Sequence, residues 1–532
     1  MRMKVSFILL FIAFSVALVN GQENPNVELP QFVITGKEAY EFPPLEKQKP
    51  ELVSTVSEQF FKPVYSPDEL EVKDFSEPTK RNGEFLDSVK FVNGEAEFLI
   101  GNNYLPSLSA TYRLPMESSL FSANINAVNQ RAYLENADRS KFGARLFYNY
   151  IISDSSSFLP FSKFRASAVV ENESYKLFAS PVPDFNRQFL HGNLLMSMQN
   201  ISSTRFNYDV TIEDAYLNMK SDSLKENIFK INGYSKYSAK IFDFSLFGKF
   251  HLLNSTFDPL SSEQFAFIQM KGMFGFQIGN FTKTNFGFEY SKLDSNNSIF
   301  PYMAAAFQFG RGFSFFAEYH PTSVMLTQQD LVITNRYYTP NVQLKNIFYS
   351  ITSLYSFSLK YEYERMFEVS GGLALFSTPN YPYFMGQAVG VNSFQMDTVE
   401  AQSASVFAKL HLFAGKYGFF GGEIIYQQVI DTAGNSVPNI TPLTLNFTYG
   451  LFVTHEISLT ASMMYYSPAF LNFANKEKGK DYFNITLKGE MNIAENLFAQ
   501  IEARNILNRK NEIWKNYLEL PLSIAAGLKI IW

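Results

Sequence analysis

The stretch that decides the fold is LPLSIAAGLKIIW, residues 520–532. Read backwards from Trp532, every second residue is apolar: Ile530, Leu528, Ala526, Ile524 and Leu522. The residues between them are more mixed and include a lysine, a glycine and a serine. A period of two is the signature of a β-strand with two different faces. A soluble sheet rarely leaves its last aromatic residue without covering chain, so we expect lipid to cover this tryptophan.

The same alternation recurs along most of the chain. In RFNYDVTIE (205–213) and YFNITLKGEMN (482–492), an apolar, aromatic-rich set alternates with charged and amide side chains. Such segments run for about 9–11 residues, the length that a tilted strand needs to cross a bilayer. Only closed barrels let strands cross lipid, because an open sheet edge leaves backbone groups unpaired. We therefore predict an all-β fold, a transmembrane antiparallel β-barrel.

The connections between these segments alternate in length. Long ones are expected at Arg509–Glu519, Pro468–Lys480, Asp431–Pro442, Thr378–Glu400 and Pro321–Leu344, and short ones at Ala494–Asn496, Thr454–Glu456, Ala414–Lys416, Arg365–Met366 and Gly310–Gly312. Short periplasmic turns and long outer loops are typical of outer-membrane barrels. Extending this alternation of long and short connections back to the start of the barrel gives about 22 strands, with 18 or 20 as alternatives. The chain then enters the first strand and leaves the last strand on the periplasmic side.

The composition fits this class of protein. Aromatic residues make up 17% of the 532 residues and charged residues 18%, while the mean hydropathy is only -0.10. Averaging lipid-facing with water-facing positions gives such values, whereas a bundle of membrane helices would be far more apolar. The net charge of -5 gives no indication of a nucleic-acid partner. The absence of cysteine excludes disulfides and a lipidated cysteine.

Two segments precede the predicted barrel. Residues 1–21 have a positive start, an apolar core and a small residue before the expected cut, so we expect a secretory signal peptide rather than a buried helix. Residues 22–88 contain eight of the 23 prolines and many glutamates. Proline removes backbone donors and fixes φ, so we expect an extended periplasmic arm there. The barrel is predicted over residues 89–532.

The C-terminal region resembles the TonB-dependent receptor family. RNILNRK (504–510), the aromatic residues Trp514 and Tyr517, Pro521 and the last strand together look like that family's closing hairpin. TPNVQLKN (339–346) is a weaker echo of another family segment, without its second proline and its acid. The resemblance implies an outer-membrane transport protein. It also implies a folded plug inside the barrel, for which residues 22–88 are too few and too rich in proline.

A short run in the arm is similar to the TonB box of this family. It consists of Phe32, Val33, Ile34, Thr35 and Gly36. In the family, this segment pairs as an added strand with the energy-transducing protein TonB, and a β-branched run in a proline-flanked arm suits that role. The alternative readings are a chance apolar pentapeptide or a local strand at the barrel rim. TonB or another periplasmic protein is thus the partner expected for the arm.

Charged residues on the inward phase are the candidate lumen-lining residues. They are Arg205, Asp209, Glu213, Asp243, Lys249, Lys488 and Glu490. We expect these acids and bases to pair across strands, with solute selectivity as a further hypothesis. The histidines His191, His251, His320, His411 and His455 are too far apart in sequence to suggest a metal or catalytic site. We expect neither cofactor nor metal, and treat the long connection Thr378–Glu400 as a candidate ligand contact.

Three functional hypotheses and one competing fold remain open on sequence alone. The leading one is an outer-membrane transport protein that moves or binds a small, unidentified solute, with lipid as its surroundings. The second is a barrel that serves as a scaffold or anchor for a periplasmic or surface complex. An outer-membrane hydrolase would need a clustered histidine with serine or aspartate, and a soluble secreted all-β protein would be extracted without detergent.

Overall fold

The computed structural model describes residues 92–152, 161–200, 205–239, 241–258, 261–279, 281–293, 296–309, 312–340, 348–363, 366–386, 393–454 and 456–532. The signal peptide, the arm and the TonB-box-like run lie outside these residues, as does His455.

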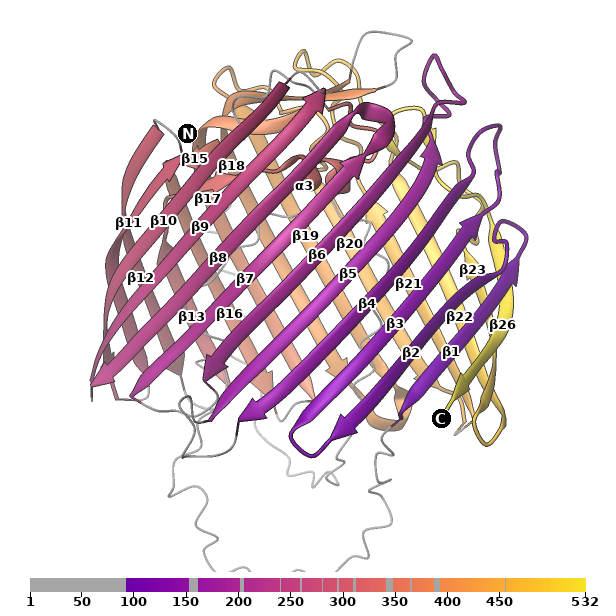
Figure 1. Cartoon of the computed structure of the whole chain (residues 1–532), viewed down its shortest axis with the longest axis horizontal. Helices are drawn as coiled ribbons and strands as arrows, with labels where there is room; N and C mark the ends of the chain where they lie inside the picture. Colours follow the sequence, from indigo (N-terminus) through magenta and orange to yellow (C-terminus); the bar gives the residue numbers. More distant parts are fainter. Residues whose placement is uncertain are drawn as a thin grey trace, which may run out of the picture. The chain divides into compact units, whose positions relative to one another are not determined.

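The described strands form a closed antiparallel barrel of 22 strands (Figure 1). The first half of the wall consists of β1 (Gly94–Gly101), β2 (Ser107–Met116), β3 (Ser119–Gln130), β4 (Arg139–Ile152), β5 (Ser162–Lys176), β6 (Asn186–Asn200), β7 (Phe206–Met219), β8 (Leu224–Ala239), β9 (Phe242–Asp258), β10 (Ser261–Ile278) and β11 (Thr282–Leu293). The second half consists of β12 (Asn296–Phe309), β13 (Phe313–Tyr319), β16 (Ser353–Tyr363), β17 (Phe367–Gly386), β18 (Phe394–Phe413), β19 (Phe419–Asp431), β20 (Leu443–Phe452), β21 (Ile457–Tyr466), β22 (Tyr482–Ala494), β23 (Leu497–Arg504) and β26 (Ser523–Ile531). β26 pairs with β1, with Lys529 opposite Glu97, so the wall has no free end. The predicted fold class and strand number are confirmed.

The two ends of the barrel differ in their connections. We call the end with the short connections the turn end; residues 117–118 join β2 to β3 there, and residues 495–496 join β22 to β23. We call the other end the loop end, which carries residues 320–352, 432–442, 467–481 and 505–522. The loop end also holds the short elements β14 (Thr322–Met325), α3 (Gln328–Thr334), β15 (Phe348–Ile351), β24 (Glu512–Trp514), β25 (Tyr517–Leu518) and the 3-10 turn η2 (Lys220–Asp222). A second 3-10 turn, η3 (Gly415–Tyr417), lies at the turn end.

The prediction of a long connection over Thr378–Glu400 is wrong. β17 continues to Gly386 and pairs there with Phe394 at the start of β18. Pro379 lies in the irregular stretch between Thr378 and Tyr381, where the pairing with β18 shifts. Pro382 is tolerated because β16 begins only at Ser353, opposite Ser377. Beyond that level β17 pairs only with β18, and a strand with one open side can accept residues without an N–H.

The two faces of the wall differ as the alternation predicts. On β9 the side chains of Phe242 and Phe244 are 46% and 56% exposed on the outer face, whereas Asp243 between them is 7% exposed and faces the lumen. At the end of the chain, Trp532 belongs to the outward set. Its ring lies where a Cβ on Gly94 would be, 2.3 Å from the nearest ring atom, so this position of β1 accommodates the tryptophan by lacking a side chain.

The main packed core lies inside the barrel toward the loop end. The largest cluster joins inward side chains of β6 to β9, such as Leu217 and Leu224, with Leu331 and Val332 of α3. No helix in the described ranges is long and apolar enough to cross a membrane.

Candidate functional site

The described chain between β13 and β16, residues 320–340 and 348–352, folds into the lumen. We call these two ranges together the inner segment. β13 pairs with β12 only as far as Tyr319, opposite Met303. Past that point the chain leaves the wall, and β14 and β15 pair with each other. Phe348 of β15 packs on Phe267 and Leu293, which belong to the inner face of β10 and β11. The inner segment therefore occupies the lumen.

A buried polar cluster fixes the point where the inner segment begins. Glu289 of β11 accepts hydrogen bonds from Gln269 (2.7 Å) and Thr322 (2.6 Å), and its other oxygen lies 2.9 Å from Nε2 of His320. Lys271 lies 3.2 Å from the same histidine nitrogen. Glu289 and Lys271 are only 1% and 3% exposed. One carboxylate thus binds side chains on both sides of the bend at Pro321, which holds the exit angle of the chain.

Helix α3 is anchored to the wall through its first turn. Thr327 caps the helix, and the side chain of Asp330 accepts a hydrogen bond from the Thr327 N–H, which completes a capping box. Glu226 of β8 accepts hydrogen bonds from the backbone N–H groups of Gln328 (2.9 Å) and Gln329 (3.1 Å). A carboxylate at a helix N-terminus satisfies unpaired donors and interacts favourably with the helix dipole. The wall therefore supplies a specific acceptor for this helix.

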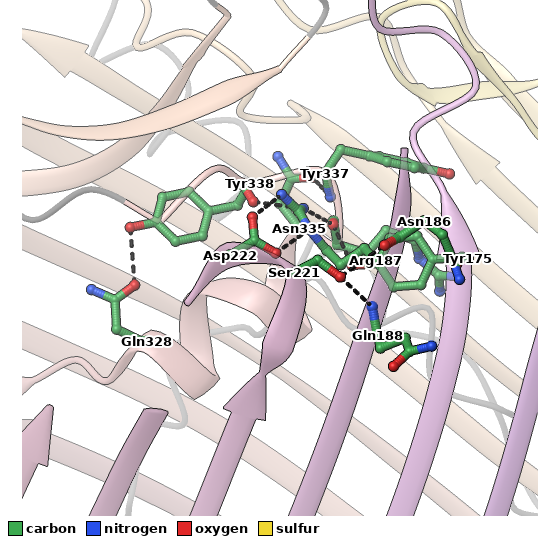
Figure 2. Close-up of polar contacts among 11 residues, drawn as sticks. Tyr175, Asn186, Arg187, Gln188, Ser221, Asp222, Gln328, Asn335, Tyr337 and Tyr338 are labelled. Atoms are coloured by element: carbon green, nitrogen blue, oxygen red, sulfur yellow. Dashed lines mark hydrogen bonds and ion pairs between the residues drawn. The ribbon is translucent and has the colours of Figure 1, made fainter. Parts of the chain in front are cut away.

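Arg187 of β6 binds the far side of the inner segment, as Figure 2 shows. Its Nε and Nη2 donate to the carboxylate of Asp222 at 2.8 and 2.7 Å, a two-point ion pair. Its Nη1 donates to the backbone carbonyls of Arg336 and Tyr338, each at 2.9 Å. With 1% exposure, the guanidinium is fully enclosed. The buried guanidinium therefore holds the stretch from Arg336 to Tyr338 of the inner segment against β6.

The connection 505–522 covers the inner segment from the loop end. Tyr517 stacks on Tyr337 with ring centroids 3.5 Å apart. Trp514 makes edge contacts with Phe384 of β17 and Phe394 of β18, at 5.4 and 4.9 Å. Burial raises the pKa of Glu519 in this connection, although the nearby Arg336 opposes the shift. Two connections that are far apart in sequence thus pack against each other over the lumen.

The amount of buried apolar surface indicates that the inner segment is fixed in place. Leu331, Val332, Tyr337, Tyr338 and Phe348 are each at most 8% exposed. At roughly 1.5–3 kcal/mol for each buried side chain, their burial contributes on the order of 10 kcal/mol. Release of the segment would expose these side chains to water, which opposes the gain in chain entropy. We therefore expect the described part of the inner segment to stay packed in the lumen.

The predicted lumen residues pair only in part as expected. Lys488 binds Glu490 of the same strand at 2.9 Å. Glu213 pairs with Lys230 at 3.0 Å, and Asp243 lies between Lys236 and Lys283 at 3.0 and 3.1 Å, so their partners are lysines that the prediction did not name.

Among the described residues, the other three predicted residues form no ion pair with an oppositely charged side chain. They are Arg205, Asp209 and Lys249. Lys249 lies over the ring of Phe247, 5.2 Å from its centroid. Asp209 accepts a hydrogen bond from Thr211 at 3.4 Å, and Arg205 lies just before β7 at the turn end. A role of any of these residues in solute selectivity stays a prediction. No group of three or more His, Asp or Glu side chains within the described ranges could hold a metal ion.

Sequence reasoning did not single out Arg187, Asp222 or Glu226. Their importance comes from contacts with the inner segment, more than a hundred residues away in sequence for Arg187 and Glu226. One local signal was present, because Thr327 and Asp330 have the spacing of a capping box within a predicted long connection. The TonB-box-like run, Phe32 to Gly36, lies outside the described residues and stays a prediction.

The comparisons with known proteins identify the fold. No protein-family model matches the chain, and no curated protein matches it either. Among solved structures, the chain is similar to the ferric-catecholate import receptor Fiu of Escherichia coli K12, with a TM-score of 0.62, 8% identity, and coverage of 83% of this chain and 82% of that one. It is also similar to the copper transporter OprC (0.61, 9%, 82% and 80%) and to the FrpB iron transporter of Neisseria meningitidis (0.62, 9%, 82% and 81%).

These structural similarities test the resemblance to TonB-dependent receptors that the C-terminal hairpin suggests. At 8–9% identity they show a shared barrel fold and nothing finer. The resemblance to the barrel of TonB-dependent receptors is thereby confirmed at the level of the fold. The expected lack of a plug concerns residues 22–88 and stays a prediction.

Proposed function

We propose that this chain is an outer-membrane protein that moves a small solute through its lumen, and that the inner segment sets the width of the path. The observation that carries the proposal is a lumen lined by charged side chains, closed off from lipid by 22 paired strands and narrowed by residues 320–340 and 348–352. An anchor needs only an apolar outer face, whereas a polar lumen of this kind suits the passage of a hydrated solute.

The proposed orientation follows the asymmetry of the connections. The loop end faces the outside of the cell, and the turn end, where β1 begins, faces the periplasm. The run Phe32 to Gly36 is proposed to add as a strand to TonB or to another periplasmic protein. Because the structurally similar proteins include an import receptor for a ferric catecholate and transporters of copper and iron, a small solute is the proposed cargo. We propose no enzymatic activity.

Conductance in planar bilayers tests the proposal. Three purified proteins are compared: the intact chain, a variant without Gln22–Thr79, and a variant in which residues 326–347 are replaced by a short Gly-Ser linker between β14 and β15. We expect the third protein to conduct several times more current than the intact one, because α3 and its flanking chain no longer occupy the lumen. Closure of the intact chain, relieved by deletion of the arm alone, would assign the block to the arm instead.

A second candidate function is a scaffold or anchor. The observation that favours it is the packing of the inner segment, because a barrel that transports nothing can have a filled lumen. Absence of current in all three proteins would contradict transport and support the scaffold. Co-purification of a stoichiometric partner that depends on residues 22–88 would then identify the complex.

A further inference from the structure

A cavity of about 220 Å³ opens at the loop end between two hairpins. We call it the mouth pocket; one wall is the connection 467–481 between β21 and β22, and the other is the turn of β24 and β25. Its charged lining residues are Glu477, Lys478, Lys480, Glu512 and Lys515. The volume lies below the usual range for drug-sized ligands, so the pocket fits a molecule no larger than a monosaccharide or a dipeptide.

Ion pairs join the two walls of the mouth pocket. Lys480 of the first hairpin binds Glu512 of the second, and Lys515 of the second binds Glu477 of the first. These pairs are partly exposed, so each contributes little to stability. They nevertheless neutralise both carboxylates of the lining and link the two hairpins.

Lys478 is the lysine of the lining that has no such pair. Its ammonium lies 4.7 Å from the ring centroid of Phe470, and no carboxylate of the described residues is within ion-pair distance. The lining therefore has one positive charge in excess, and it also includes the amides of Asn439 and Asn516 and the hydroxyls of Thr441 and Ser467. A pocket with one excess ammonium and several amides and hydroxyls is suited to an anionic group on a molecule rich in hydroxyls.

We propose that the mouth pocket binds a small anionic, hydroxyl-bearing solute whose carboxylate or phosphate pairs with Lys478. The proposal rests on the proposed transport function, for which it names the class of solute. The location is suitable, because the hairpin that contributes Glu512 and Lys515 to the pocket packs through Trp514 and Tyr517 on the aromatic cluster over the inner segment. A bound solute would thus lie at the entrance to the constricted lumen.

Calorimetric titration of the detergent-purified protein tests this site. The probes are four hexose derivatives of similar size: glucuronate, glucose 6-phosphate, glucose and glucosamine. Trp514 and Trp532 are the only tryptophans in the chain, so a Trp532→Phe background makes Trp514 a reporter of the hairpin. In the calorimetric titration we expect saturable binding of one or both anionic sugars, and at least tenfold weaker binding of glucose and glucosamine. In a parallel fluorescence titration we expect the anionic sugars that bind to change the emission of Trp514.

Two matched variants locate the binding. Lys478→Gln removes the excess charge, whereas Lys476→Gln changes a second lysine of the same hairpin, exposed like Lys478, that does not line the cavity. We expect Lys478→Gln to weaken binding at least tenfold and Lys476→Gln to leave it within twofold. Glucuronate alone would identify a carboxylate ligand, and glucose 6-phosphate alone would identify a phosphate.

Three outcomes would overturn the proposal: no binding of either anion, equal binding of glucosamine, or binding that Lys478→Gln leaves unchanged. The titration in detergent requires no transport. A barrel that binds the anion but passes no current would contradict the proposed transport function and leave the proposed anion site supported. A barrel that passes current but binds neither anion would contradict the anion site and leave the transport function supported.

Discussion

At the scale of single residues, Arg187 shows how a wall strand holds a distant part of the chain. Its guanidinium makes four hydrogen bonds, two to Asp222 and two to backbone carbonyls of the inner segment. Removing one partner of a buried pair leaves the other charge without compensation in a site that excludes water. The two carbonyls would also lose their donor, which adds to the cost.

We therefore expect Arg187→Gln to lower the free energy of unfolding by about 3 kcal/mol or more. The measurement is unfolding by denaturant in detergent. Arg113→Gln is the matched control, because Arg113 also pairs with a carboxylate, that of Glu95 at 2.9 Å, but both side chains are about one-third exposed. Its expected cost is below about 1 kcal/mol. Equal losses in the two variants would contradict the importance assigned to Arg187.

At the scale of secondary-structure elements, the alternating pattern predicts the barrel strands and most of their connections. A strand in a barrel wall has one face toward lipid and one toward the lumen, so its sequence alone records its environment. The long connection Pro321–Leu344 was also predicted, yet its position in the lumen was not. Its apolar residues, such as Leu331 and Tyr338, pack on strands that only the closed fold brings near. The continuation of β17 beyond Thr378 was missed because prolines suggested a loop, while the open side of that strand depends on where β16 begins.

The seam between β1 and β26 allows a prediction at this scale. A Cβ added at Gly527 would lie 1.8 Å from the carbonyl oxygen of Phe98, a backbone atom of the partner strand. We expect Gly527→Ala to destabilise the barrel by about 1–3 kcal/mol, because the two backbones must move apart. Gly248→Ala is the control, since a Cβ there meets no atom within 4 Å. Loss of stability in both variants, measured by denaturant unfolding, would show that the seam is not the cause.

At the scale of the whole molecule, the sorting of connections between the two ends is the strongest sign of a fixed orientation. Every connection longer than ten residues lies at the loop end of the described barrel. Long extracellular loops and short periplasmic turns are typical of outer-membrane barrels. The orientation proposed above can therefore be tested directly.

The chain contains no cysteine, so single cysteines can be placed without background. We expect Lys476→Cys, in an exposed position of the connection 467–481, to react with a membrane-impermeant maleimide on intact cells. Glu495→Cys, in the exposed turn between β22 and β23, should react only after the outer membrane is permeabilised. The opposite pattern would invert the proposed orientation, and labelling of both on intact cells would contradict insertion in the outer membrane.

The pairing of β1 with β26 also has a consequence for the order in which the molecule is assembled. These strands are at opposite ends of the described chain, so the ring can close only after the last strand has been synthesised. The wall partners of the inner segment on β5 to β11 all precede it in the chain and are available earlier. The hairpin β24–β25 comes directly before the closing strand. The inner segment can thus pack on β5 to β11 before the barrel closes. The hairpin β24–β25, which packs over it, becomes available together with β26, the strand that closes the barrel.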